Sequence, residues 1–105
     1  MAALDSIRAR IKARDYLLTK HAADQLITRD ISIAELEQAL LGEAEMIEDY
    51  PQDKYGPSCL ILGYTGTGRA LHAQCAYSDP AVVKIVTVYE PDPARWTDMR
   101  IRRRE

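Results

Sequence analysis

Two histidines, His21 and His72, carry the side chains best suited to acid–base chemistry in this chain of 105 residues. An unperturbed imidazole has a pKa close to physiological pH, so the ring can both accept and donate a proton there. His72 lies in a run of strand-forming residues, and the expected register places it opposite Thr87, with Tyr89 on the diagonal. Thr87 could orient the imidazole of His72, and Tyr89 could donate a proton. The alternative is that His72 and Thr87 form only a cross-strand hydrogen-bonded pair.

The second histidine belongs to a predicted helix over residues 20–29, on which His21, Gln25 and Thr28 share one face. His21 falls in the first turn, where the helix dipole disfavours a cationic imidazole. A neutral ring at this position can accept a proton. The alternative is a helix-start histidine that bonds only to nearby backbone.

The stretch from Ser58 to Pro93 must position His72. It contains three strand-like runs, over residues 59–64, 69–77 and 82–90, separated by two loops of turn residues. Short loops between such runs are typical of two β-hairpins in series. With four residues in each loop, Leu62 would lie opposite Leu71, and Tyr77 opposite Val82. A shift of one residue would send His72 into the core.

In this register the two sheet faces differ in character, because side chains alternate along a strand. One face is a core with Lys84 as a misfit: Leu60, Leu62, Leu71, Ala73, Cys75, Tyr77, Val82, Val86 and Val88. The other face carries Ile61, Gly63, His72, Gln74, Ile85, Thr87 and Tyr89.

The remaining elements precede this stretch. We predict a helix over residues 4–13, an extended segment over 16–19, the helix over 20–29 capped by Thr19, and a strand over 44–50. Ser32 and Glu35 form a capping box that starts a third helix, which Gly42 ends. The order predicts an α+β fold in which helices pack on one face of a four-stranded antiparallel sheet, or a five-stranded one if residues 16–19 add an edge strand. Residues 1–105 form one domain, with a basic helix over 1–14 and a basic tail over 94–105.

Composition excludes several classes of protein. With 47% hydrophobic and 29% charged residues the chain is globular rather than disordered. No run reaches the roughly 20 apolar residues of a membrane span, and the first residues lack the apolar centre of a signal peptide. Cys59 and Cys75 fall on opposite sheet faces in the expected register, so we expect free thiols and a cytoplasmic protein. The cysteines and histidines lack metal-site spacing, so no metal is expected.

Charge is distributed unevenly around a net charge of −2. Acidic residues concentrate in the middle of the chain. Basic residues cluster at its two ends: Arg8, Arg10, Lys12 and Arg14, and then Arg100, Arg102, Arg103 and Arg104. This asymmetry is compatible with a basic patch on an acidic molecule, or simply with solvated faces and a frayed tail.

Five phrases of the sequence together resemble a small bacterial family, domain-of-unknown-function family 4258. They span nearly the whole chain, from residue 16 to residue 100, in the family's order. Ala70 departs from the family, which often has proline there. The phrases are Leu18-Thr19-Lys20-His21-Ala22, Arg29-Asp30-Ile31-Ser32, Ile47-Glu48-Asp49-Tyr50-Pro51, Gly68-Arg69-Ala70-Leu71-His72 and Thr87-Val88-Tyr89-Glu90-Pro91-Asp92-Pro93, followed by Trp96.

The resemblance implies a RelE-like fold, shared with small ribonuclease toxins of toxin–antitoxin pairs. It also implies metal-independent cleavage of RNA by attack of the ribose 2′-hydroxyl on the adjacent phosphate, without a cofactor. The expected partners are RNA and a zinc-finger antitoxin encoded nearby, and a homodimer is compatible with the family. For this reaction the expected catalytic residues are His21, His72 and Tyr89. The expected substrate-binding residues are Arg29, Arg69, Thr87 and Gln74.

Two other functions are compatible with the same residues. The overall acidity favours a non-catalytic module of the same fold that binds protein or RNA. A weaker reading is a small-molecule pocket that uses Tyr89, His72 and Gln74 as polar anchors.

Overall fold

The computed structural model describes residues 2–53 and 56–103. Its helices are α1 (Ala2–Lys12), α2 (Lys20–Thr28) and α3 (Ile33–Leu41). Its strands are β1 (Tyr16–Leu18), β2 (Glu45–Tyr50), β3 (Ser58–Tyr64), β4 (Ala70–Ala76), β5 (Val83–Tyr89), β6 (Trp96–Thr97) and β7 (Ile101–Arg102). The α+β class is therefore confirmed.

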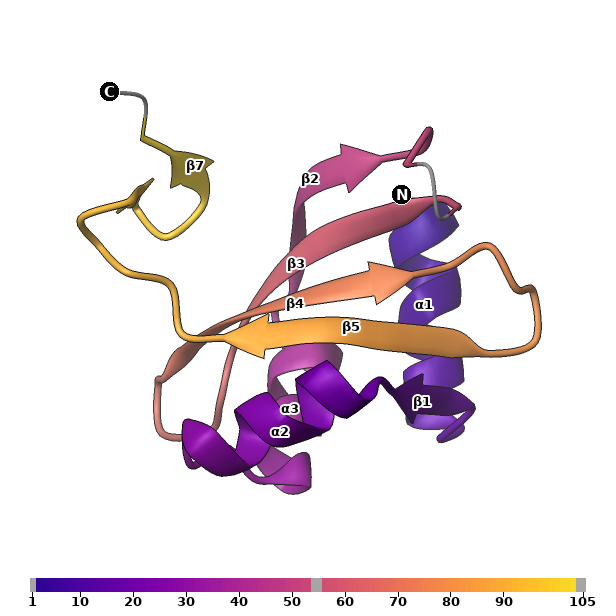
Figure 1. Ribbon diagram of the computed structural model, residues 1–105, viewed down its shortest axis with the longest axis horizontal. Coiled ribbons are helices and arrows are strands. Elements are labelled where there is room, and N and C mark those ends of the chain that lie inside the picture. The colour runs from indigo at the N-terminus through magenta and orange to yellow at the C-terminus, as the bar shows by residue number, and fades with distance from the viewer. Residues whose placement is uncertain (1, 54–55, 104–105) are drawn as a thin grey trace.

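The main sheet is mixed and has five strands in the order β1-β5-β4-β3-β2 (Figure 1). β2, β3, β4 and β5 are antiparallel neighbours, whereas β1 runs parallel to β5. The expectation of a purely antiparallel sheet was wrong at this edge. β1 covers only the first half of β5, and the side chain of Gln25 on α2 accepts a hydrogen bond from the Val88 amide beyond it, at 2.8 Å.

Local signals define the helix starts. The Thr19 hydroxyl accepts a hydrogen bond from the Ala22 amide at 3.1 Å and caps α2. Ser32 and Glu35 form both bonds of the predicted capping box at the start of α3. Gly42 follows the last residue of α3, as predicted, although its φ of −84° is not left-handed. These predictions succeeded because each depends on residues only three or four positions apart.

The register between β3 and β4 differs from the prediction by one residue. Five residues, 65–69, separate these strands, so Tyr64 pairs with Ala70 and Leu62 pairs with His72. The Thr65 hydroxyl accepts a hydrogen bond from the Arg69 amide, and this bond helps to close the longer loop. β3 therefore turns Cys59 and Ile61 toward the helices, and not Leu60 and Leu62 as expected.

The register between β4 and β5 also differs. His72 lies opposite Tyr89, and Gln74, not His72, lies opposite Thr87. The pairing then shifts between Gln74 and Cys75. A shift of this kind reverses which side chains face the helices. Val83 and Ile85 are therefore in the core instead of the predicted Val82 and Val86, and the misfit Lys84 is exposed.

The core lies between the helices and one face of the sheet. Its buried members are Ile7, Ile11, Ala22, Leu26, Ile31, Leu36, Ala39, Leu40, Cys59, Ile61, Leu71, Ala73, Cys75, Val83, Ile85 and Val88. Cys59 and Cys75 are directly opposite each other, buried and free. The expectation that they lie on opposite faces was wrong because of the register shift.

Residues 91–103, which we call the C-terminal segment, follow β5 and contain the β6–β7 pair. β6 and β7 pair with each other and form no ladder with the main sheet. Figure 1 shows the segment away from α2 and α3. Leu60, Leu62, His72 and Trp96 are buried outside the helix-side core. The segment therefore covers part of the second sheet face.

Among the described residues, no helix has the length and apolar character needed to cross a bilayer.

Candidate functional site

His72 is the centre of a polar and aromatic cluster beneath the C-terminal segment. Its side chain has no exposed surface. The ring lies edge-on to Trp96, with centroids 4.5 Å apart. Nε2 lies 2.6 Å from the carbonyl oxygen of Met99, and Nδ1 lies 3.2 Å from the hydroxyl oxygen of Tyr89. Because a carbonyl can only accept, Nε2 carries the proton, and Nδ1 of a neutral ring accepts from Tyr89.

Burial keeps this pair uncharged. It lowers the pKa of His72, against the opposing effects of the Met99 carbonyl and Glu48, and Arg102 lowers the pKa further. Burial also raises the pKa of Tyr89. At neutral pH the site therefore holds a neutral imidazole hydrogen-bonded to a neutral phenol.

Glu48 of β2 brings a carboxylate to the edge of this cluster. Its Oε1 accepts a hydrogen bond from Nη2 of Arg102 at 3.0 Å, and the hydroxyl of Tyr50 also donates to it. Burial alone would raise the pKa of Glu48, but the bonds from Arg102 and Tyr50 lower it overall. Arg102 also stacks on Trp96, with its guanidinium carbon 4.6 Å from the ring centroid. Sequence reasoning gave Glu48 no role, although it lies in one of the five quoted phrases.

A groove continues from this cluster along the uncovered part of the second sheet face. One hollow of about 720 Å³ is lined by Tyr50, Pro51, Gln52, Asp53 and Gln74. A second, of about 580 Å³, shares Asp53 and Gln74 and adds the apolar side chains of Leu17, Val82 and Val86 with Lys84. Gln74 donates to the Ser58 hydroxyl at 3.4 Å, which in turn donates to Asp53 at 3.1 Å.

Gln74 joins the groove to the buried cluster. On β4 it is two residues from His72, and its partner Thr87 on β5 is two residues from Tyr89. Residues two apart on a strand share a face. The predicted residues His72, Gln74, Thr87 and Tyr89 therefore form two neighbouring cross-strand pairs, one covered and one bordering the groove.

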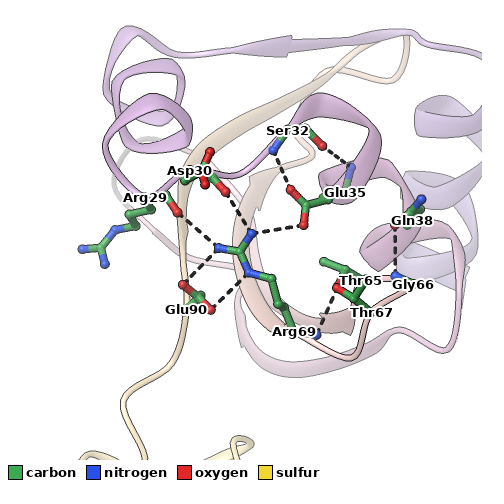
Figure 2. A network of polar contacts seen from close by, with 10 residues as sticks. All are labelled: Arg29, Asp30, Ser32, Glu35, Gln38, Thr65, Gly66, Thr67, Arg69 and Glu90. Carbon is green, nitrogen blue, oxygen red and sulfur yellow. Dashed lines mark hydrogen bonds and ion pairs between the residues drawn. The ribbon is translucent and has the colours of Figure 1, made fainter.

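Arg69 is fully engaged in a separate network (Figure 2). Its Nε and Nη2 donate to the two carboxylate oxygens of Glu90 at 3.3 and 3.1 Å. Nη1 donates to Glu35 and to the carbonyl of Asp30, and Nη2 also reaches the carbonyl of Arg29. A guanidinium has five N–H groups, so none remains for a phosphate. Arg69 ties the α2–α3 turn to the end of β5.

Arg29 differs from Arg69. Its backbone belongs to the network, but Figure 2 shows its side chain pointing away from it. Within residues 2–53 and 56–103 the guanidinium forms no polar contact and is exposed. Of the two predicted phosphate ligands, Arg29 is the one with free donors.

His21 is exposed on α2, whereas His72 is inaccessible. The contacts of the His72 ring are with Tyr89, Trp96 and Met99. The expectation that the two imidazoles act on one phosphate is therefore not met in this arrangement, because a phosphate cannot reach His72.

The basic ends of the chain are largely used within the molecule. Arg8 donates to the carbonyls of Leu40 and Leu41 at the end of α3, at 3.2 and 2.7 Å. Two arginines pair with carboxylates of β2: Arg100 with Glu45 at 3.1 Å, and Arg102 with Glu48 at 3.0 Å. The acidic edge strand thus neutralises Arg100 and Arg102 of the predicted basic tail, whereas among the described residues Arg95 and Arg103 form no ion pair; Arg104 lies outside the described residues.

The comparisons with known proteins agree with part of the sequence resemblance. A family described as "Domain of unknown function (DUF4258)" matches residues 18–90. The chain belongs to this family. The match includes His21, Glu48, His72 and Tyr89 and ends before the C-terminal segment. No curated protein and no solved structure matched the chain.

Proposed function

We propose that this DUF4258 protein is a RelE-like, metal-independent endoribonuclease of a toxin–antitoxin pair, with its chemistry centred on His72. The observation that carries the proposal is the Tyr89–His72 hydrogen bond, next to a carboxylate and at the end of a groove. Such cleavage needs a base for the 2′-hydroxyl, an acid for the leaving oxygen and a cation for the phosphate.

The geometry suggests a role for each group. The Glu48 carboxylate takes the proton of the 2′-hydroxyl, whose oxygen attacks phosphorus while the bond from phosphorus to O5′ breaks. Nε2–H of His72 donates to O5′ as Nδ1 takes the proton of Tyr89. The proton on Glu48 later returns through solvent to Nε2, while Nδ1 gives its proton back to Tyr89, so the starting tautomer is restored. The products are a 2′,3′-cyclic phosphate and a free 5′-hydroxyl.

The remaining predicted residues support this reaction. The free guanidinium of Arg29 binds phosphate. Arg69 positions Arg29, because its guanidinium bonds both to the backbone carbonyl of Arg29 and to the carboxylate of Glu90. Gln74 and Thr87 contact RNA where the groove meets the cluster. His21 was also predicted as an acid–base residue, but it is exposed on α2 and the proposed reaction assigns it no step.

Cleavage of a labelled single-stranded RNA in the presence of EDTA tests the proposal. We expect His72→Ala to lower the rate by about 10²-fold or more, the usual contribution of a general acid or base. Tyr89→Phe should lower it as well, and circular dichroism checks that both variants fold. His21→Ala, the matched control, should stay within a few-fold of wild type. Equal rates for wild type and His72→Ala would exclude His72 as the centre of the reaction.

A non-catalytic module that binds a partner protein is the second candidate. It is favoured by the complete burial of His72 and by the groove, which offers Lys84 beside Asp53 and Asp79 and so little positive charge for RNA. In that case Gln74→Arg should weaken binding to the antitoxin expected from the family resemblance, while no variant changes RNA cleavage.

A further inference from the structure

The C-terminal segment holds His72 through contacts that compete with a substrate. The Met99 carbonyl occupies Nε2 at 2.6 Å, which is the atom that would donate to the leaving oxygen. Arg102 occupies the Glu48 carboxylate at 3.0 Å. Trp96, only 4% exposed, covers the imidazole ring. One segment thus blocks both the proposed acid and the proposed base.

The attachment of this segment is made of side-chain contacts. The main-chain hydrogen bonds from amides of residues 95–103 that lie outside strand pairing all end on carbonyls of residues 92–97: Arg95 and Trp96 to Asp92, Arg100 to Thr97, and Arg103 to Arg95. β6 and β7 form their own ladder. The segment is therefore internally bonded, and it can leave the sheet without breaking a strand pairing of the body.

Two features of the segment favour such a movement. Pro91 and Pro93 lie at its start, and neither has a main-chain N–H that could hold the segment to the sheet. Asp98 and Met99, at the turn that presents the carbonyl to His72, have φ values of 55° and 62°. Positive φ is unfavourable for side-chain-bearing residues, so the turn depends on its contacts to be retained.

We propose that the C-terminal segment is an autoinhibitory cover that must leave the second sheet face before His72 and Glu48 can meet RNA. This inference rests on the proposed function. The closed state is the one described by the structure. The open state joins the groove at Gln74 to the His72–Tyr89 pair and frees the Glu48 carboxylate from Arg102.

Trp96 is the only tryptophan of the chain and so reports the position of the segment in the intact protein. The variant Arg100→Gln with Arg102→Gln removes the ion pairs to β2. We expect its tryptophan emission to shift to the red. The population of the open state should rise by up to roughly tenfold, which is the change in equilibrium expected when the ion pairs of two surface arginines are lost. The matched control, Arg95→Gln with Arg103→Gln, removes the same charge from the same segment. In the described residues, the side chain of Arg103 bonds only to the Pro93 carbonyl within the segment, and Arg95 forms no side-chain polar contact.

Tryptophan accessibility and RNA cleavage together separate the two proposals. A red shift and faster, His72-dependent cleavage in the ion-pair variant, but not in the control, support both. Unchanged emission and acrylamide quenching in the ion-pair variant would overturn the cover, whatever its cleavage rate. A red shift in the ion-pair variant without any His72-dependent cleavage would show that the segment can move. It would nevertheless reject both the nuclease proposal and the proposal that the segment inhibits it.

Discussion

At the scale of single residues, Gly63 shows how closely α3 lies on β3. A Cβ built at this position would lie 2.1 Å from the carbonyl oxygen of Ala39, and both are backbone or backbone-attached atoms that cannot turn aside. We therefore predict that Gly63→Ala pushes α3 off the sheet and lowers the free energy of unfolding by about 3 kcal/mol or more, the upper range for overpacking. Urea denaturation measures this.

Gly66→Ala is the matched control for that prediction. Its Cβ would meet the end of the flexible Gln38 side chain at 3.3 Å. The side chain can move, so the variant should stay within about 0.5 kcal/mol of wild type, as is usual for surface changes. Equal losses at both glycines would show that the contact with Ala39 is not the cause.

Arg69 gives a second prediction at this scale. Its planar fork matches five acceptors on three parts of the chain, and a lysine ammonium cannot reproduce that pattern. Arg69→Lys should therefore lower Tm and speed amide exchange in the α2–α3 turn. Arg29→Lys, which changes an unbonded guanidinium in the same turn, should leave both unchanged. Protection of the turn that survives Arg69→Lys would contradict the role assigned to the network.

At the scale of elements, the docking of the C-terminal segment should depend on pH through His72. Its pKa in the folded protein lies below the ordinary value of 6.5, chiefly because of burial. The unfolded chain then binds more protons than the folded protein. The contribution of His72 to the free energy of unfolding is therefore fully present above about pH 6.5 and is lost as the pH falls toward the pKa of the folded state. The charged and titratable groups around the ring are Glu48 on β2, Tyr89 on β5 and Arg102 on β7.

The measurement is the unfolding free energy and the Trp96 emission between pH 7 and pH 5. We expect the wild type and His21→Ala to lose stability and shift to the red over this range. His72→Gln should flatten the dependence. A slope that persists in His72→Gln would assign the titration to other groups.

The elements also show what the sequence could and could not predict. Helix starts at Thr19 and Ser32 were predictable because the capping bonds are local. The strand register was not, because it depends on a fifth loop residue, closed by Thr65 and Arg69, and on a shift after Gln74. These two register errors placed the side chains of β3, and those of Val83 and Ile85 on β5, on the wrong face of the sheet. The side chains of β4 were assigned to the correct face.

The same reasons explain the site. His72 lies outside the helix-side core, as its strand pattern predicted. Its cover was missed because a segment with two-residue strands and two prolines has no periodic signal. Glu48 and Arg102 were missed because a carboxylate on an edge strand and an arginine in a basic tail look like solvated charges until the tail folds back.

At the scale of the whole molecule, the distribution of charge limits how RNA can bind. Most described arginine side chains bond within the molecule, and the proposal relies on two described cations without an ion pair, Arg29 and Lys84. On single-stranded RNA each neutralised phosphate contributes about −0.7 to the slope of log affinity against log salt. We therefore predict a shallow slope of about −1.4, measured by fluorescence anisotropy of a labelled RNA.

Arg29→Gln and Lys84→Gln should each make the slope shallower by about 0.7, whereas Arg14→Gln, which removes a charge paired with Glu37, should not change it. A slope of about −3 or steeper would mean that arginines now bound to β2 are released onto the RNA, because the closed molecule has too few free cations near the groove to produce it.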